Sequence, residues 1–150
     1  MNNTISNTFY LGIDAGGTKT QAVVTNQDCS IKTEYITGSG NYKAVGLQQA
    51  IQNIKEATQN AIQNIQNKLK TTIEIESACI GMASLDTPHD REILTEAIQK
   101  AFKNLPILKC KLVNDTKIAL RSGTKNPNAI VLIAGTGSHC YGTNQKGVEV

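Results

Sequence analysis

The chain has 150 residues, 39% of them hydrophobic, and its 15 Lys and Arg against 12 Asp and Glu give a net charge of +3. This length fits one ordinary domain, or one domain and the start of another, and the apolar content can bury a core, which excludes a disordered chain. The small, scattered positive charge gives no indication of a nucleic-acid or membrane-surface binder, so we expect neither partner.

The cysteines are far apart in the sequence and form no C-x-x-C pair. Zinc sites and small disulfide frameworks need closer spacing, so we expect buried, reduced thiols and a cytoplasmic protein. The polar tail over residues 1–9 lacks the basic and apolar regions of a signal peptide. No apolar run approaches the ~20 residues of a membrane span, and the sequence predicts a soluble, unexported chain.

Short apolar runs separated by turns follow this tail. We expect strands over 9–13, 21–25 and 30–37, with glycines after the first and a turn cluster, Asn26–Asp28, after the second. Tight turns between consecutive strands are typical of an antiparallel meander.

The hydrophobic period then changes to that of helices. Between Lys43 and Leu69, apolar side chains recur every three or four residues, which predicts one long amphipathic helix. A coiled coil is the alternative, but its flanking positions would carry paired charges, and here they are Gln and Asn. A second helix is expected from Asp90 to Phe102, and a short one over Thr116–Arg121.

Further apolar runs at 77–82, 107–113 and 129–134 are typical of buried strands, and a last hairpin is expected from 139 onward, turning at 144–147. The order β-β-β-α-β-α-β-α, followed by new strands, predicts an α/β fold. It is a mixed sheet with an antiparallel meander and flanking helices.

The first segment that carries chemistry is LGIDAGGTKT, residues 11–20. Gly16 and Gly17 let backbone N–H groups approach an anion, and Thr18 adds a hydroxyl. Asp14 would repel a phosphate, so it indicates a divalent cation such as Mg²⁺ between the two. A hairpin turn with a solvated Asp is the alternative. A P-loop is excluded, because Thr18 occupies the position of the Walker lysine and the following segment is typical of a strand.

The second segment is LVNDTKIAL, residues 112–120. Asp115 lies where a strand ends and a helix begins, which is where α/β sheets place their ligands. Alternatively, Asp115 is the N-cap of that helix, and both descriptions can hold together.

The third segment is LIAGTGSHCYG, residues 132–142, in which Gly135 and Gly137 flank Thr136, and Ser138 follows. These residues predict a second anion site made of amides and hydroxyls, with a plain glycine hairpin as the alternative. The segment repeats the pattern of residues 13–18, because both combine an apolar strand, a glycine turn and a hydroxyl residue.

In this order and at these distances, the segments resemble the actin-like ATPase superfamily of sugar kinases, heat-shock ATPases and actin. Within it, the chain is similar to the N-acetylglucosamine kinase group, or BadF/BadG-type ATPases, over residues 10–147. The resemblance implies an actin-like ATPase (ribonuclease H-like) lobe over 10–125 and the first strands of an incomplete second lobe over 129–150. These last strands are expected to pair with another chain, as in a homodimer, or to be poorly ordered.

The resemblance also implies ATP and Mg²⁺ as cofactors and a role for each matching residue. Asp14 would coordinate Mg²⁺ through water, and Asp115 would be the base that takes the proton from a sugar hydroxyl. Asn41, in GSGN, matches an asparagine that touches the sugar. Ser84 replaces a family glycine on the sugar side, which leaves the choice of sugar open. The phosphates would face Gly16, Gly17, Thr18 and Lys19 from one lobe, and Gly135, Thr136, Gly137 and Ser138 from the other.

We therefore expect the N-terminal part of an ATP-dependent kinase that phosphorylates an amino sugar, N-acetylglucosamine or glucosamine, on its 6-hydroxyl. One alternative is an ATPase that activates a dehydratase through an iron–sulfur cluster. The other is a sugar sensor without turnover.

Overall fold

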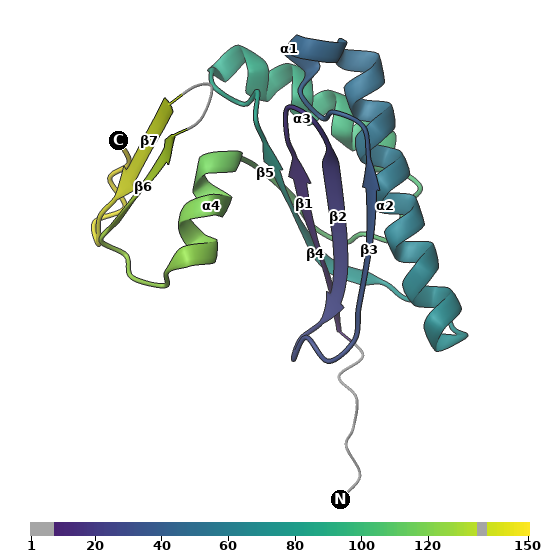
Figure 1. Ribbon diagram of the computed structural model, residues 1–150. Coiled ribbons are helices and arrows are strands. Elements are labelled where there is room, and N and C mark those ends of the chain that lie inside the picture. Colours follow the sequence, from purple (N-terminus) through teal and green to yellow (C-terminus); the bar gives the residue numbers. More distant parts are fainter. Residues whose placement is uncertain (1–7, 135–137) are drawn as a thin grey trace, which may run out of the picture.

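The computed structural model describes residues 8–134 and 138–150. The helices and strands follow one another along the chain as Figure 1 shows. In order they are β1 (Phe9–Ala15), β2 (Thr20–Asn26), β3 (Lys32–Thr37), α1 (Tyr42–Val45), α2 (Leu47–Leu69), β4 (Ile75–Met82), α3 (Pro88–Phe102), β5 (Cys110–Asn114), α4 (Asp115–Gly123), β6 (Ala129–Ala134) and β7 (Ser138–Thr143).

The main sheet has five strands in the order β3-β2-β1-β4-β5. β1 and β2, and β2 and β3, pair antiparallel, whereas β4 runs parallel to both β1 and β5. The predicted α/β fold, with a mixed sheet and an antiparallel meander, is therefore confirmed. The segment after Gly17 leads into strand β2 at Thr20 and not into a helix, which also confirms that it is not a P-loop.

Two helices, α2 and α3, cover one face of the sheet, and α4 lies on the other (Figure 1). Alternate residues of β1 point into the core between the sheet and α2–α3, as the period of a strand requires. The buried face of α2 includes Ile54, Ala61 and Ile65, which confirms the predicted amphipathic helix. The helix is broken once, because Gly46 has φ +82° and separates α1 from α2.

The remaining boundaries differ from the prediction by a few residues. α3 begins at Pro88 instead of Asp90, because Thr87 and Asp90 form a capping box around its first turn. β5 is shorter than predicted, although Ile107 still bridges to Ile75. Within the described residues, no helix is long and apolar enough to cross a membrane.

The hairpin β6–β7 forms a small sheet of its own and contacts α4. The prediction that β6 is buried is wrong: Ile130 and Leu132 are 75% and 70% exposed. The reason is that β7 is the strand paired with β6, and the outward face of this pair remains open to solvent. The predicted turn is confirmed, since the Gly147 N–H donates to the Asn144 carbonyl at 2.9 Å. That 129–150 begins a second lobe stays a prediction.

The expectation of buried cysteines is also wrong. Cys29, Cys79, Cys110 and Cys140 are free thiols, as expected, but all are exposed. Cys79 lies in β4 on the face opposite α2 and α3, which α4 covers only in part. The cytoplasmic location inferred from these cysteines stays a prediction.

Candidate functional site

The candidate site lies at the end of the main sheet where β1, β4 and β5 finish. These strands are parallel, so their carboxyl ends meet at one edge, and such edges are where α/β sheets bind ligands. Asp14 is the penultimate residue of β1, Ser84 follows β4, and Asp115 follows β5. β3 ends at the same edge and leads through residues 38–40 to Asn41.

The hairpin loop 16–19 is held in place by its own backbone and by neighbouring loops. The Gly16 N–H donates to the Lys19 carbonyl at 2.9 Å, and the Gly16 carbonyl accepts from the Gly40 N–H at 3.0 Å. The Ala83 N–H donates to the Ala15 carbonyl at 3.1 Å. Gly17, Thr18 and Lys19 are exposed, so the predicted phosphate loop is fixed at its base and open to solvent.

The loop before Asn41 packs against this hairpin through a glycine. A Cβ on Gly40 would lie 2.6 Å from the Cβ of Ala15 and 2.8 Å from Oγ1 of Thr20, so only glycine fits without movement. Asn41 then caps α1, its side chain accepting from the Lys43 N–H at 2.9 Å. This packing brings Asn41 to the same edge of the sheet as Asp14.

A second glycine brings α4 onto the sheet. A Cβ on Gly81 would lie 2.3 Å from Cδ1 of Ile118 and 3.5 Å from the Cα of Asp115, so α4 begins directly over β4. The N-cap of α4 is Asn114, whose side chain accepts from the Thr116 N–H at 3.0 Å. The alternative that Asp115 is the N-cap is therefore wrong, and its carboxylate is not needed for capping.

This packing places the carboxylates of Asp14 and Asp115 within electrostatic range of each other. Burial is the main cause that raises the pKa of Asp14, although part of its side chain reaches solvent, and the negative charge of Asp115 raises it further. The ammonium of Lys19 acts in the opposite direction. The pair is therefore a place where a positive charge would be stabilised.

The chemistry of this pair fits Mg²⁺. Within residues 8–134 and 138–150, no three His, Cys, Asp or Glu side chains are grouped so that they could hold a metal ion. A cation beside two carboxylates would therefore complete its shell with phosphate oxygens and water, which is how Mg²⁺ is usually bound.

The other predicted residues have different surroundings. Ser84 is fully buried, and its Oγ, like Oγ1 of Thr20, has no hydrogen-bond partner among the described residues. Ser138 begins β7 and is exposed on the separate hairpin. Gly135, Thr136 and Gly137 lie outside the described residues.

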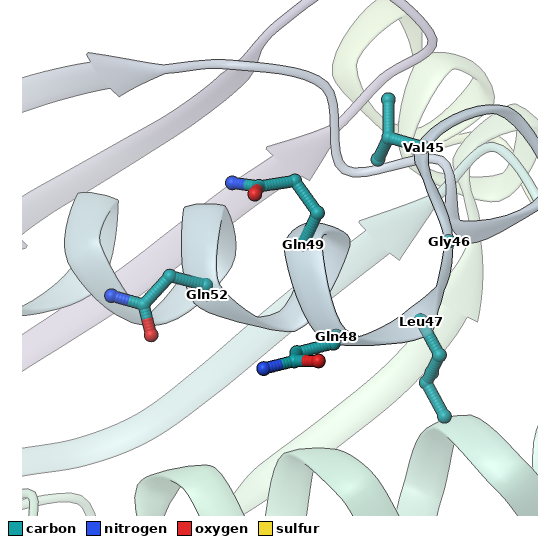
Figure 2. A pocket seen from close by; sticks show the side chains of 6 residues that line it. All are labelled: Val45, Gly46, Leu47, Gln48, Gln49 and Gln52. Atoms are coloured by element: carbon teal, nitrogen blue, oxygen red, sulfur yellow. The ribbon is translucent and has the colours of Figure 1, made fainter.

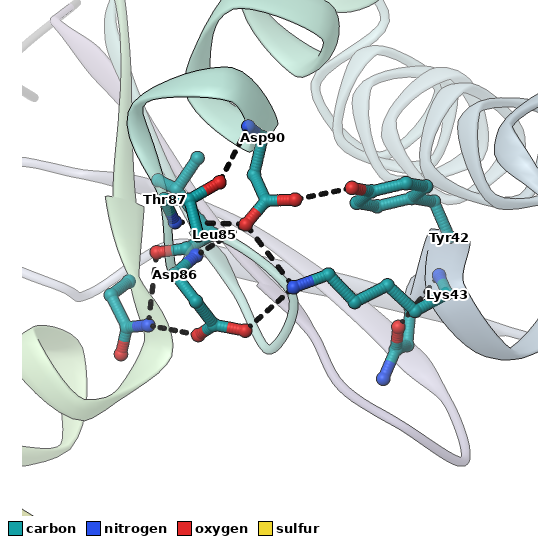
Figure 3. Close-up of polar contacts among 8 residues, drawn as sticks. Tyr42, Lys43, Leu85, Asp86, Thr87 and Asp90 are labelled. Carbon is teal, nitrogen blue, oxygen red and sulfur yellow. Dashed lines mark hydrogen bonds and ion pairs between the residues drawn. The ribbon is translucent and has the colours of Figure 1, made fainter.

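Sequence reasoning missed a group of charged side chains beside the site (Figure 3). Nζ of Lys43 contacts carboxylate oxygens of Asp86 at 2.9 Å and of Asp90 at 3.1 Å. Asp90 is buried and also accepts from the Tyr42 hydroxyl and, at 2.8 Å, from the Thr87 N–H. The T-x-x-D spacing of the capping box could have revealed Asp90, but no local pattern indicates that Lys43 meets Asp86.

A separate hollow lies at the junction of α1 and α2 (Figure 2). Its side chains are apolar or neutral amides, and none of them is acidic, basic or nucleophilic. It is lined by Val45, Gly46, Leu47, Gln48, Gln49 and Gln52. The chemistry therefore points to the sheet edge with Asp14 and Asp115 as the functional site.

Two known proteins are similar to this chain in sequence. An N-acetylmuramic acid/N-acetylglucosamine kinase of Clostridium acetobutylicum is 33% identical over 140 residues, covering 93% of this chain and 44% of that protein. An N-acetyl-D-glucosamine kinase of Dictyostelium discoideum is 29% identical over 154 residues, covering 97% of this chain and 46% of that protein. The chain thus spans less than half the length of either relative.

The fold is also that of solved actin-like kinases. A ROK family glucokinase from Streptomyces griseus, solved with glucose and AMPPNP, superposes with a TM-score of 0.63 at 19% identity, covering 91% of this chain and 44% of that one. The actin-like ATPase fold is thereby confirmed. The sequence itself matches a family over residues 11–150, and the chain belongs to this family, the BadF/BadG/BcrA/BcrD ATPases.

Proposed function

We propose that the chain is the N-terminal part of an ATP-dependent kinase that phosphorylates an amino sugar, N-acetylglucosamine or glucosamine, on its 6-hydroxyl. One observation carries the proposal: a glycine hairpin loop, Asp14 and Asp115 share one edge of the sheet, and the charges of the two carboxylates interact. The names of the two relatives, both kinases of N-acetylated amino sugars, support the class of acceptor.

In this proposal, the hairpin loop receives the phosphates of ATP. The exposed backbone of Gly17 and Thr18 and the ammonium of Lys19 offer donors and positive charge to phosphate oxygens. Asp14 would hold Mg²⁺ through water, with the negative charge of Asp115 within electrostatic range. When bound, that ion neutralises the negative charge of the phosphates, which would otherwise be repelled by Asp14. The second phosphate segment, residues 135–138, is proposed to act from the other lobe.

Asp115 is proposed as the base that accepts the proton of the sugar hydroxyl. It lies at the first position of α4, partly exposed, and its carboxylate is free of the capping role that Asn114 performs. Asn41 is proposed to hydrogen-bond the sugar from the neighbouring loop. Ser84 is buried, and its hydroxyl has no hydrogen-bond partner among the residues that the structure describes, so we propose that it shapes the sugar site from below the surface.

The test is phosphorylation of a panel of amino sugars by the longest natural polypeptide that contains this chain. ADP release and the phosphorus NMR spectrum of the product are recorded with N-acetylglucosamine, glucosamine and glucose. We expect a 6-phosphate of one amino sugar and little turnover of glucose. Sugar binding without ADP release would support a sensor instead. Iron in anaerobically purified protein, with the matching visible spectrum, would support an activator of a dehydratase.

A further inference from the structure

We propose that the carboxylate of Asp86 positions the two acceptor-side residues, Asn41 and Asp115, by joining their chain neighbours Lys43 and Asn114. The proposal rests on the proposed kinase function and adds positioning residues to it. The three side chains, Lys43, Asp86 and Asn114, are called the Lys43–Asp86–Asn114 bridge below.

Asp86 accepts hydrogen bonds through both of its carboxylate oxygens. Oδ2 accepts from Nζ of Lys43 at 2.9 Å, and Oδ1 accepts from Nδ2 of Asn114 at 3.2 Å. Lys43 stands two residues after Asn41 in α1, and Asn114 directly precedes Asp115. One carboxylate therefore connects α1, whose N-cap is Asn41, with the junction of β5 and α4.

On the side of α4, Asn114 links Asp86 to Asp115, because it directly precedes Asp115 and caps the helix that Asp115 begins. Its Nδ2 also donates to the Leu85 carbonyl at 3.1 Å, while its Oδ1 accepts from the Thr116 N–H at 3.0 Å. The same side chain thus caps α4 and fastens the cap to the loop that carries Asp86. Any shift of this loop would move the first turn of α4, where Asp115 lies.

On the side of α1, the buried carboxylate of Asp90 anchors Lys43 and the loop that carries Asp86. Its carboxylate accepts from Nζ of Lys43 at 3.1 Å and from the backbone N–H groups of Asp86 at 3.1 Å and of Thr87 at 2.8 Å. The Tyr42 hydroxyl donates to its other oxygen. Lys43 is thereby held between two carboxylates, which raise its pKa and keep it charged.

The side chains of the bridge are partly exposed, so we expect their ion pair to affect the position of the site residues more than the stability of the fold. The side chains of Lys43 and Asp86 are 43% and 45% exposed, and ion pairs so accessible to water contribute little to folding. The effect of such a pair is to select one arrangement of the loops that it joins. A small displacement of a reacting group can lower a rate by up to ~10²-fold, so the bridge matters for turnover more than for stability.

The experiment compares Lys43→Met and Asp86→Ala with Lys43→Arg, which retains the charge. The matched control is Glu76→Gln, which breaks the Lys109–Glu76 ion pair of 2.8 Å on β4, away from the site. Kinetics are measured in the longest natural polypeptide that contains the chain. Hydrogen exchange of the Thr116 amide is measured by NMR in the chain itself and needs no activity.

We expect Lys43→Met and Asp86→Ala each to raise the KM for the sugar and to lower kcat by ~10-fold, with the KM for ATP changed less than ~2-fold. Thr116 exchange should accelerate in both, and Lys43→Arg should retain most of the activity. The kcat of the double variant should fall by less than the product of the two single losses. Glu76→Gln should behave as the unaltered protein.

The proposed bridge would be contradicted if the Thr116 amide exchanged at the same rate in both variants and the unaltered protein. It would also be contradicted if the two losses of kcat multiplied in the double variant. An equal loss in Glu76→Gln would contradict it as well. If the unaltered protein phosphorylates no amino sugar, the proposed function fails. The exchange rates still decide whether the bridge fixes the start of α4, so the two failures are distinguishable.

Discussion

The carboxylate of Asp115 lies close enough to that of Asp14 to raise its pKa, although the two residues belong to different elements, α4 and β1. The approach depends on Gly81, whose missing side chain leaves room for Ile118. Two like charges held together in this way cost stability unless a cation joins them. This relationship is what we expect of a site built to bind a metal–phosphate complex.

Asp14→Asn should therefore stabilise the chain at neutral pH in the absence of metal. A carboxyl whose pKa is higher in the folded state than in the unfolded state favours folding at low pH, and this contribution is lost as the pH rises through the folded pKa. We expect the Tm of Asp14→Asn to exceed that of the unaltered chain at pH 7, with the difference shrinking toward pH 4. Thermal unfolding followed by circular dichroism, without divalent ions, measures it.

The matched control is Asp28→Asn, for which we expect a change in Tm of the opposite sign. The pKa of Asp28 is lowered by hydrogen bonds from the Ser30 hydroxyl and N–H, so its charge favours folding at neutral pH. This variant should lower the Tm slightly at pH 7. A fall in Tm for Asp14→Asn as well would contradict the proposed repulsion between Asp14 and Asp115.

Asp90→Asn should lower the stability of the chain and make that stability less sensitive to acidic pH. Hydrogen bonding from Tyr42 is the main cause that holds the pKa of Asp90 well below its usual range, and Thr87 and Lys43 add to it. The stabilisation is present above the unfolded pKa of ~3.9 and is lost as the pH falls through the lower folded pKa. We expect a Tm reduced by ~5–10 °C at pH 7.

The measurement for Asp90 is the Tm between pH 7 and pH 3. The Tm of the unaltered chain should fall further over this range than the Tm of Asp90→Asn, because the variant no longer has the titrating group. Parallel curves for the two proteins would show that Asp90 does not contribute to acid sensitivity.

Gly81→Val should displace α4 from β4. Its side chain would collide with Ile118, since even a Cβ would lie 2.3 Å from Cδ1 and 3.1 Å from Cγ1 of that residue. We expect a loss of ~1–3 kcal/mol in the free energy of unfolding. The pKa of Asp14, followed by NMR titration, should move down toward its ordinary value as Asp115 recedes. Adding Ile118→Ala should reverse both effects, and an unchanged pKa of Asp14 in Gly81→Val would argue against this packing.

Gly40→Ala should destabilise the site through the loop that carries Asn41. Its Cβ would meet the Cβ of Ala15 at 2.6 Å and the backbone Cα of Ala15 at 2.9 Å, and a backbone atom cannot rotate away. We expect ~1–3 kcal/mol of lost stability in urea unfolding. Gly123→Ala is the control, because a Cβ there meets nothing within 4 Å. Equal stability of the two variants would contradict the close approach.

The sequence predicted those parts of the fold in which local pattern determines structure. The alternation in β1, the helical period of α2 and the positions of Asp14 and Asp115 at strand ends were all visible in short segments. The break at Gly46 also had a local signal, a glycine within a helical period, whose positive φ the structure shows.

Features that depend on distant residues could not be predicted in this way. The apolar pattern of β6 is the same whether or not another layer covers it, so the exposure of Leu132 was not apparent. The contact of Lys43 with Asp86 joins α1 to the loop before α3, 43 positions away, and neither segment alone has a pattern that requires the other. The exposure of Cys79 likewise depends on how much of the sheet α4 covers.

The most direct test of the central claim is the kcat of Asp115→Asn with ATP, Mg²⁺ and N-acetylglucosamine, in the longest natural polypeptide that contains the chain. Asn keeps the size of the side chain and removes the base, so we expect kcat to fall by ~10²–10⁴-fold while sugar binding is retained. Asp28→Asn, in the exposed turn between β2 and β3, should keep normal turnover. Turnover by Asp115→Asn within a few fold of the unaltered protein would contradict the claim that Asp115 is the base.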